Sequence, residues 1–481
     1  MKYKEGLVGK EILEDRQGEA MLLTEDSSGT GKKLFLESYG CQMNFSDSEL
    51  VATIMSKEGY TTTRDASEAD VVLINTCAIR ENAEQRVRNR IVQYNRMKKE
   101  RPALIIGMLG CMAERLKEKL LEEEKLLDIV VGPDAYRDLP NLVEQAGSGQ
   151  KAVNVLLSRE ETYADINPIR LNSNGVTAYI SIMRGCDNMC SFCVVPFTRG
   201  RERSRDPKSI VHEAKYLFEQ GYREVTLLGQ NVDSYRWNVN RKKEIINEEE
   251  ETVNFAQLLI KVAEVNTRLR VRFSTSHPKD MTDDVLHAIN DHENICNYIH
   301  LPVQSGNSEI LKKMNRGYTR EWYMSRIESI KKIIPDCAIS TDIISGFCGE
   351  TDEQHEDTLS LMKWVKYDSS YMFLYSERPR TLAQRKYEDD IPQDVKQKRH
   401  GAVVELQKIY SSFHTEKCMG QTHEILIEGI SKKSSDELFG RNSQNLVFIL
   451  PKGDLKPGDY VMAEAVSCST HTVRAKLVKK I

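Results

Sequence analysis

The sequence predicts an α/β protein with an N-terminal open parallel α/β domain, a partial (β/α)6 barrel and a C-terminal small antiparallel β-barrel. Three observations support this order. In the first 150 residues, short apolar runs alternate with helical patterns, which is typical of a parallel sheet. Six further strand–helix units follow between residues 172 and 407. Between residues 411 and 481, short strands punctuated by glycines replace that alternation.

The N-terminal domain is expected to span residues 33–150, after a flexible leader of residues 1–32. A helix is expected to begin near Ser46, because Ser-Asp-Ser-Glu has capping character and apolar residues follow it. The four expected strands are the runs Lys33–Ser38, Val71–Asn75, Ala103–Gly107 and Asp128–Gly132.

One cysteine follows each of the first three of these strands, and the spacing between them is about one strand–helix unit. They are Cys41, Cys77 and Cys111. Sites in open parallel sheets form at the carboxyl ends of the strands, so the three thiols can converge at one edge. The alternative is that they are three small buried residues, since free cysteine packs well in a core.

The middle domain, residues 172–407, has six expected strands separated by helical patterns. They are Ala178–Ile182, Glu224–Leu228, Arg270–Phe273, Tyr298–Leu301, Ala338–Ile343 and Ser370–Leu374. The charged segment Tyr235–Thr252 interrupts the pattern and is expected to be an exposed loop. The C-terminal domain, residues 411–481, has expected strands at Glu424–Glu428, Leu446–Ile449 and Tyr460–Val466.

Composition excludes several classes of protein. The 481 residues carry 68 basic and 72 acidic side chains, so RNA binding would depend on local basic residues. No run approaches the roughly 20 apolar residues of a membrane span, and the first residues lack the apolar stretch of a secretory signal. We therefore expect a cytoplasmic protein without membrane contact, in which the eleven cysteines are not disulfides.

The motif with the clearest chemistry is Cys186-x3-Cys190-x2-Cys193, which directly follows an expected strand. Three thiolates on one loop can hold three irons of a cubane cluster, and the fourth iron then lacks a protein ligand. A small molecule can bind at that iron, as at an open catalytic metal position. The alternative, a purely structural triplet, is disfavoured by the spacing.

This motif, with Phe192 before its last cysteine, resembles the radical S-adenosylmethionine (SAM) superfamily. The stretch MRGCDNMCSFCVVPFTRGRERSR, residues 183–205, is similar more narrowly to the methylthiotransferases. So are YGCQMNFSDSE (39–49), NTCAIRENAE (75–84), LGCMAER (109–115), HLPVQSGN (300–307), MNRGYTREWY (314–323) and STDIISGF (340–347). The C-terminal barrel resembles the TRAM RNA-binding domain, and Gln42-Met43-Asn44 resembles tRNA enzymes of the MiaB type. Cys348 and residues 375–381 depart from the family pattern.

The resemblance implies two [4Fe–4S] clusters, which make all six cysteines catalytic as well as metal ligands. Cys186, Cys190 and Cys193 would hold the cluster that splits SAM into a radical, and Cys41, Cys77 and Cys111 an auxiliary cluster that carries sulfur. The radical would take the C2 hydrogen of N6-isopentenyladenosine at position 37 of tRNA, and a second SAM would methylate the sulfur. The product would be 2-methylthio-N6-isopentenyladenosine. The expected SAM contacts are Phe192, Gly229, Gln230, Asn231, Ile344 and Gly346.

Arginines are the expected substrate contacts, because a planar guanidinium suits phosphate and carboxylate groups. They are Arg199, Arg201, Arg203, Arg205 and Arg441, and the alternative for each is a solvated charged surface. The resemblance implies the anticodon stem-loop of tRNA, an electron donor of flavodoxin or ferredoxin type and an iron–sulfur or sulfur supply protein as partners. We expect a monomer.

Two other functions stay open on the sequence. The same chemistry can act on a ribosomal protein or on threonylcarbamoyl-adenosine in tRNA. A non-catalytic iron–sulfur protein that binds RNA or acts as a sensor is the alternative outside enzymes. The presence of two cysteine triplets favours the enzyme, since a sensor needs only one cluster.

Overall fold

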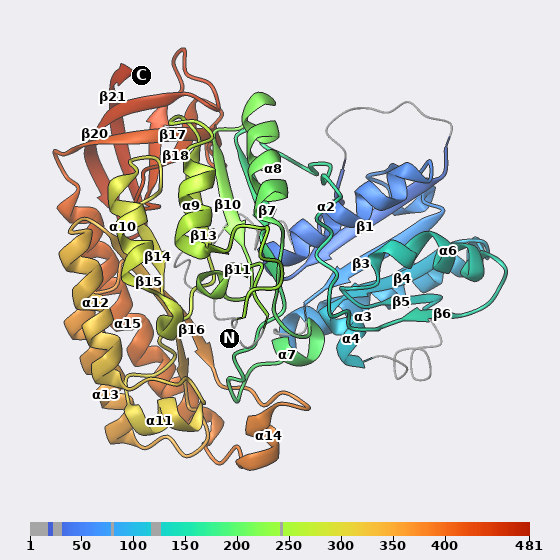
Figure 1. The fold of residues 1–481 in the computed structure, drawn as a ribbon, viewed down its shortest axis with the longest axis horizontal. Helices are drawn as coiled ribbons and strands as arrows, with labels where there is room; N and C mark the ends of the chain where they lie inside the picture. Colours follow the sequence, from blue (N-terminus) through green and yellow to red (C-terminus); the bar gives the residue numbers. More distant parts are fainter. Residues whose placement is uncertain (1–17, 23–30, 78–80, 117–126, 241–243) are drawn as a thin grey trace.

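The computed structural model describes residues 18–22, 31–77, 81–116, 127–240 and 244–481. Figure 1 shows three parts: an N-terminal α/β layer structure, a central domain whose helices lie outside its strands, and a C-terminal barrel that packs on the central domain. This arrangement confirms the predicted fold class. Among the described residues, no helix has both the length and the hydropathy needed to cross a membrane.

The N-terminal domain is a six-stranded sheet in the order β2-β1-β3-β4-β5-β6. All of its pairs are parallel, as predicted. Hydrophobic clusters cover both faces, which explains the uninterrupted apolar runs of its strands. The strands are β1 (Lys33–Tyr39), β2 (Thr61–Thr62), β3 (Val71–Thr76), β4 (Ile105–Gly110), β5 (Ile129–Val131) and β6 (Ala152–Asn154); the helices are α2 (Gln42–Lys57), α3 (Glu81–Glu100), α4 (Cys111–Leu116) and α6 (Leu139–Gly147).

The strand order of this sheet changes direction at β1. Strand β2 is added on one side of β1 and β3 on the other. The carboxyl ends of β1 and β3 therefore form a topological switch point, where loops diverge and open doubly wound sheets bind their ligands.

Part of the predicted leader is ordered, which corrects that prediction for residues 18–22. Ala20 forms an antiparallel bridge with Glu37 of β1, and Met21 N–H donates to the carbonyl of Leu36 at 2.8 Å. The Met21 side chain is buried in the core, and Asn172 hydrogen-bonds the same segment. Residues 1–17 and 23–30 of the leader lie outside the described residues.

The central domain is an open parallel barrel of six strands. It consists of two parallel sheets, β7-β10-β13 and β14-β15-β16, which a parallel bridge between Val271 and Ile295 joins. The strands are β7 (Thr177–Ser181), β10 (Glu224–Leu228), β13 (Arg270–Ser274), β14 (Tyr298–His300), β15 (Ala338–Ser345) and β16 (Ser369–Leu374).

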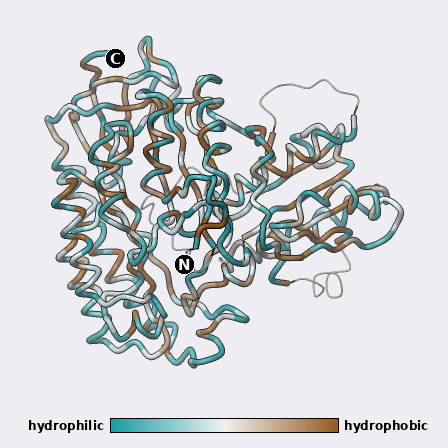
Figure 2. The backbone as a smooth tube through the Cα atoms, viewed as in Figure 1, coloured by the Kyte–Doolittle hydropathy of each residue, from teal (hydrophilic) through white to brown (hydrophobic). Residues whose placement is uncertain are grey.

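One long helix follows each of these strands and packs outside the barrel (Figure 1). Hydrophobic and hydrophilic residues alternate along these helices, and the hydrophobic ones reach the central core (Figure 2). The six helices are α8 (Pro207–Glu219), α9 (Phe255–Ala263), α10 (Asp283–Asp291), α12 (Arg320–Ile333), α13 (Asp352–Val365) and α15 (Gln393–Lys417); shorter elements are β8 (Met183–Arg184), α7 (Val195–Thr198), β9 (Arg203–Ser204), α11 (Ser308–Lys313) and α14 (Leu382–Lys386).

The charged segment after β10 is exposed only in part, contrary to the expectation for Tyr235–Thr252. Strands β11 (Arg236–Trp237) and β12 (Val253–Asn254) pair and close its base. Tyr235 is fully buried, and its hydroxyl donates to the carbonyl of Arg205 at 2.7 Å. Residues 244–252 are exposed, as predicted.

The C-terminal barrel closes in the order β17-β18-β19-β21-β20. Its pairs are antiparallel except for β19 with β21, which run parallel, so the barrel is mixed rather than wholly antiparallel. Closure pairs every strand of this barrel on both sides. The strands are β17 (Thr422–Ile430), β18 (Glu437–Arg441), β19 (Val447–Pro451), β20 (Tyr460–Ser469) and β21 (Thr472–Lys480).

Candidate active site

The three N-terminal cysteines meet at the switch point of the sheet. Tyr39 pairs with Thr76, and Thr76 pairs with Gly110, so the ends of β1, β3 and β4 form one row. Each cysteine follows that row within two residues: Cys41 is the N-cap of α2, Cys77 follows β3, and Cys111 is the first residue of α4. The register of the parallel strands therefore brings them together.

The thiols interact with one another and with one guanidinium. The pKa of Cys41 is lowered to about 6, first by a hydrogen bond with Cys77, with help from Arg199 and against the effect of burial. Burial raises the pKa of Cys111, and Arg199 opposes that rise. A thiol at a helix N-terminus near a cation has the surroundings that favour a thiolate, which is the form that binds iron.

Two glycines allow the chain to turn so close to these thiols. Gly40 has φ +131°, and a Cβ there would lie 2.4 Å from Cβ of Cys77. Gly110 has φ +86°, and a Cβ there would lie 2.5 Å from Oδ1 of Asn75. Asn75 in turn donates to the carbonyl of Asn44 at 2.8 Å, which ties the loop at β1 to the end of β3.

Replacing Gly40 by alanine is therefore expected to disturb the auxiliary triplet, which consists of Cys41, Cys77 and Cys111. The new Cβ would need the space of Cys77 and a backbone angle that L-residues rarely adopt. The resemblance implies two four-iron clusters, and loss of one would leave the reconstituted variant with about half the iron of the wild type, measured by iron counting. Gly59→Ala is the control, because Gly59 also has positive φ (+80°) but a Cβ there would meet nothing within 4 Å. Full iron content in Gly40→Ala would contradict the expectation.

The second triplet lies on the loop after β8. Gly185 has φ +76°, and a Cβ there would lie 2.0 Å from the carbonyl of Arg201, so the loop passes close to the chain that returns after it. Cys186 N–H donates to the carbonyl of Gly200 at 3.2 Å. Burial raises the pKa of Cys193 to about 12, with Cys190 adding to the rise. An ionised triplet in this pocket therefore needs a cation, which iron supplies.

The segment Lys313–Arg316, which overlaps the MNRG motif at 314–317, holds this loop through hydrogen bonds. Ser191 N–H donates to the carbonyl of Met314 at 2.8 Å, and its hydroxyl donates to that of Lys313 at 2.9 Å. Arg316 donates to Sγ of Cys190 at 3.2 Å and to the carbonyl of Pro302 at 2.7 Å. Arg316 is a site residue that the sequence analysis did not single out, although it lies in a quoted motif.

The two triplets face each other across the domain interface. Helix α7 follows Cys193 directly and packs on α4, which begins at Cys111 (Figure 1). Val194 and Cys111 form a small buried apolar cluster. Nε–H of Arg199, the residue after α7, donates to Sγ of Cys111 at 3.2 Å.

The described residues contain no group of three His, Cys, Asp or Glu side chains placed to hold a single metal ion. A four-iron cluster makes a different demand, because each cysteine binds a different iron. Both triplets supply the soft thiolates that such clusters use. Two buried donors nearby also lack acceptors within the described part of the chain: Nη1 of Arg199 is one, and the amide of Gln230 is another. The residues present therefore fit two iron–sulfur clusters and a polar ligand.

The expected SAM residues after β10 lie next to the second triplet. Both amide atoms of Gln230 are buried without a hydrogen-bond partner among the described residues, as is Oδ1 of Asn231. Nδ2 of Asn231 donates to Asp280 at 2.7 Å, and Asp280 also accepts from Asn188, which lies between Cys186 and Cys190. Gly229 packs closely, since a Cβ there would lie 2.5 Å from Met183.

The other three expected SAM residues share one neighbourhood. Phe192 and Ile344 pack against the same apolar cluster, which contains Phe347, Cys348 and Tyr375. Cys348, which departs from the family pattern, and Tyr375, which begins the departing segment 375–381, therefore lie in the cluster against which Phe192 packs. Gly346 has φ +75°, its N–H donates to Glu350 at 2.8 Å, and Lys396 covers its Cα.

Most of the expected substrate arginines face inward, which corrects their predicted role. Arg199 pairs with Asp47 at 2.8 Å, Arg203 with both oxygens of Asp134 at 2.9 and 3.0 Å, and Arg205 with Glu213. Their side chains are almost wholly buried, so they are not available to tRNA phosphates. Arg201 is half exposed and keeps a 3.5 Å contact with Asp187. In the C-terminal barrel, Arg441 pairs with buried Glu428.

Arg199 and Arg203 instead join the central domain to the N-terminal domain. Arg184, two residues before Cys186, donates to Asp47 at 2.9 Å and lies 3.6 Å from Asp134. Arg170, which lies between these two domains in the sequence, pairs with both Glu49 and Glu213. Asp47, Asp134 and Glu49 were missed in the sequence, because nothing in a single chain marks a carboxylate as the partner of a distant arginine.

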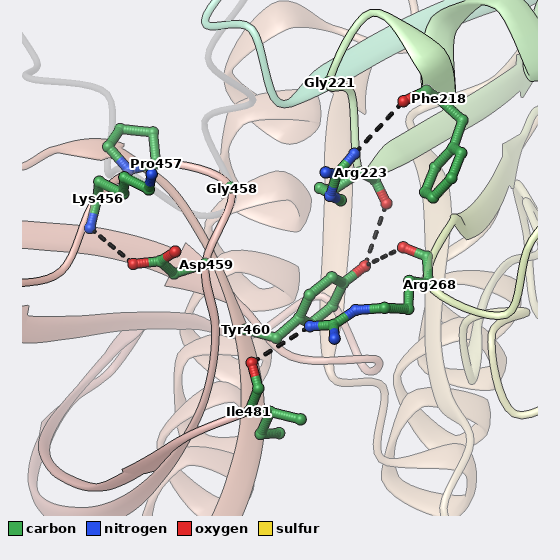
Figure 3. A pocket seen from close by; sticks show the side chains of 10 residues that line it. All are labelled: Phe218, Gly221, Arg223, Arg268, Lys456, Pro457, Gly458, Asp459, Tyr460 and Ile481. Carbon is green, nitrogen blue, oxygen red and sulfur yellow. Dashed lines mark hydrogen bonds between the residues drawn. The ribbon is translucent and has the colours of Figure 1, made fainter.

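A cavity of about 490 Å³ lies between the central domain and the C-terminal barrel (Figure 3). Tyr460 stands in it and donates from its hydroxyl to the carbonyls of Arg223 and Arg268, each at 3.1 Å, and Arg268 reaches the carbonyl of Ile481 at 3.3 Å. Arg223 and Arg268 precede β10 and β13, whereas Gln230 follows β10. The cavity is thus at the opposite end of the parallel strands from the cysteines, and the hydrogen bonds of Tyr460 and Ile481 beside it attach the barrel to the central domain.

Comparison with known proteins gives three matches to family profiles. An uncharacterized protein family, UPF0004, matches residues 33–132, the radical SAM superfamily matches residues 180–362, and the TRAM domain matches residues 416–478. The solved radical S-adenosylmethionine methyltransferase TsrM from Kitasatospora setae has a TM-score of 0.52 and 14% identity, over 71% of this chain and 73% of that chain. That likeness concerns the fold alone.

Curated relatives are much more similar in sequence. A tRNA-2-methylthio-N(6)-dimethylallyladenosine synthase of Amoebophilus asiaticus is 60% identical over 93% of this chain and 92% of its own length. The enzyme of the same name from Christiangramia forsetii is 57% identical over 96% and 97%. Membership of the radical SAM superfamily brings with it a [4Fe–4S] cluster and SAM. The resemblance inferred from the motifs is confirmed: this chain belongs to the family of the tRNA-2-methylthio-N(6)-dimethylallyladenosine synthases, which are radical SAM methylthiotransferases.

Proposed function

We propose that this chain converts N6-isopentenyladenosine at position 37 of tRNA into 2-methylthio-N6-isopentenyladenosine. The observation that carries the proposal is the pair of cysteine triplets that face each other between α4 and α7. A reaction that both activates a C–H bond and inserts sulfur needs two such centres close together. The identity with the synthases named above supports tRNA as the substrate.

Cys186, Cys190 and Cys193 hold a [4Fe–4S] cluster in this proposal, and Cys41, Cys77 and Cys111 hold a second one that carries the sulfur. The clusters supply the electron that cleaves SAM and the site at which sulfur is held. The protein's own residues position these groups. Arg316 orients Cys190 through its N–H···S contact, and the backbone bonds of Ser191 fix the loop.

The residues around Cys186, Cys190 and Cys193 suit SAM. The unpartnered amide of Gln230 offers a donor and acceptors to the polar methionine end, and Asn231 is oriented by Asp280. Phe192 and Ile344 lie on an apolar wall that suits the adenine ring, next to Gly346. A second molecule of SAM provides the methyl group.

Recognition of tRNA involves its anticodon stem-loop, since enzymes that modify a base act on it outside the helical stack. The C-terminal barrel, which matches the TRAM profile, supplies RNA contacts. Of the arginines near Cys193, Arg201 is the one with an exposed side chain for this purpose. We further propose an electron donor of flavodoxin or ferredoxin type, a protein that renews the sulfur, a monomeric enzyme, and the cytoplasm as its compartment.

The direct test is to incubate the anaerobically reconstituted protein, SAM and a reductant with tRNA from a strain that lacks this activity. Chromatography of the nucleosides should show N6-isopentenyladenosine replaced by its 2-methylthio derivative, with release of 5′-deoxyadenosine. Modification of threonylcarbamoyl-adenosine or of a ribosomal protein instead would overturn the substrate. Absence of 5′-deoxyadenosine would favour a non-catalytic iron–sulfur protein.

A further inference from the structure

Arg199 belongs by sequence to the central domain, but its side chain ends at the auxiliary cysteines. It follows α7, six residues after Cys193, and is 3% exposed. Nε–H donates to Sγ of Cys111 at 3.2 Å, and Nη2 donates to Asp47 at 2.8 Å. The guanidinium plane is thereby fixed by two partners from the N-terminal domain.

The third nitrogen of the guanidinium, Nη1, is buried and has no hydrogen-bond partner among the described residues. A buried N–H pair without an acceptor is costly, so an acceptor is expected when the site is complete. In Arg184 and Arg203, the other buried arginines that pair with Asp47 or Asp134, the unpartnered atom is Nε, which carries a single hydrogen. Arg199 is distinct because its free group carries two hydrogens.

The chemistry of the neighbouring thiols identifies the missing acceptor. Cys111 already accepts from Nε, so the unpartnered Nη1 of the same guanidinium also lies close to this triplet. A four-iron cluster on Cys41, Cys77 and Cys111 would bring inorganic sulfides, which accept hydrogen bonds, into the neighbourhood of this guanidinium. Arg199 is thus a buried cation that lies directly against this cysteine triplet.

We propose that Arg199 is a positioning residue for the auxiliary cluster, to which it donates hydrogen bonds at Cys111 and at a cluster sulfide, and whose reduction potential it raises. This inference rests on the auxiliary cluster of the proposed function. N–H···S bonds and a nearby positive charge stabilise the more negative reduced cluster, so the potential rises. The central domain thus tunes a cluster that is bound by the N-terminal domain.

The experiment uses the full chain with Cys186, Cys190 and Cys193 replaced by alanine, so that only the auxiliary cluster is observed. Its midpoint potential is measured by redox titration with electron paramagnetic resonance. We compare Arg199→Gln, which removes the charge and Nε–H, with Arg199→Lys, which keeps the charge. Arg205→Lys is the matched control, because Arg205 lies directly after β9 and is similarly buried, but pairs with Glu213 and Ser209.

Arg199→Gln should shift the reduction equilibrium at least tenfold towards the oxidised cluster, which is about 59 mV for a one-electron couple. Arg199→Lys should shift it less, and Arg205→Lys should leave it unchanged. An unchanged potential in Arg199→Gln would overturn the inference. If Arg199→Gln fails to fold or to bind iron, the potential of Arg199→Lys is the deciding measurement. The parent for this comparison is the protein with the three alanine substitutions alone, and a potential of Arg199→Lys equal to that of the parent overturns the inference. A parent protein that binds no four-iron cluster would instead refute the auxiliary cluster of the proposed function.

Discussion

Cys77→Ala should form no 2-methylthio product, although it should still cleave SAM. The substitution removes one of three ligands at the carboxyl ends of β1, β3 and β4, and leaves the loop of Cys186, Cys190 and Cys193 unchanged. Iron should fall from about eight to about four atoms per chain, because each cubane holds four. Iron counting, 5′-deoxyadenosine release and nucleoside chromatography measure the three effects separately.

Cys193→Ala is the converse variant and should lose both SAM cleavage and product. Cys296→Ala is the matched control, since Cys296 is also a buried cysteine at 2% exposure but lies in neither triplet. The control should keep its iron and its product. Full product formation by Cys77→Ala would refute the auxiliary cluster.

Asp47→Ala should destabilise the protein by about 3–5 kcal/mol, the range for removing one partner of a buried ion pair. Asp47 is 1% exposed and accepts from Arg184 at 2.9 Å and from Arg199 at 2.8 Å. Its loss leaves two buried guanidinium groups without their shared carboxylate. Urea unfolding of the iron-free protein, followed by circular dichroism, measures the change in midpoint.

The matched control for that measurement is Glu405→Ala on α15. Glu405 pairs with Lys408 at 2.6 Å, but both side chains are exposed to solvent. Exposed pairs contribute about 0–1 kcal/mol, so the midpoint should hardly move. If Asp47→Ala behaved like this control, the ion pairs would not hold the two domains together.

The cysteine sites could be predicted because their geometry follows from local order along the chain. A strand ends just before each of Cys41, Cys77 and Cys111, and in a parallel sheet such ends lie at one edge. The long apolar strands and the six strand–helix units were predictable for the same reason. Strand β21 was missed because Thr472–Lys480 carries four basic residues, and barrel closure rather than hydropathy makes it a strand.

The arginines show what a single sequence does not specify. Four arginines between Thr198 and Arg205 resemble a surface for phosphate, but the sign of a charge does not reveal its burial. Their carboxylate partners at Asp47 and Asp134 lie far earlier in the chain, and only the packing of the two domains brings them together. Residues 18–22 were likewise assigned to the leader because their bonds to β1 involve backbone atoms, which any sequence provides.

The interdomain arginines also have a consequence for biosynthesis. Glu49 and Asp47 leave the ribosome more than 100 residues before their partners, since Arg170 follows Glu49 by 121 residues and Arg199 follows Asp47 by 152. Until then, the nascent N-terminal domain carries carboxylates that cannot yet be buried in ion pairs. If Cys41, Cys77 and Cys111 hold the proposed auxiliary cluster, that cluster is therefore expected to assemble only after the central domain has been synthesised.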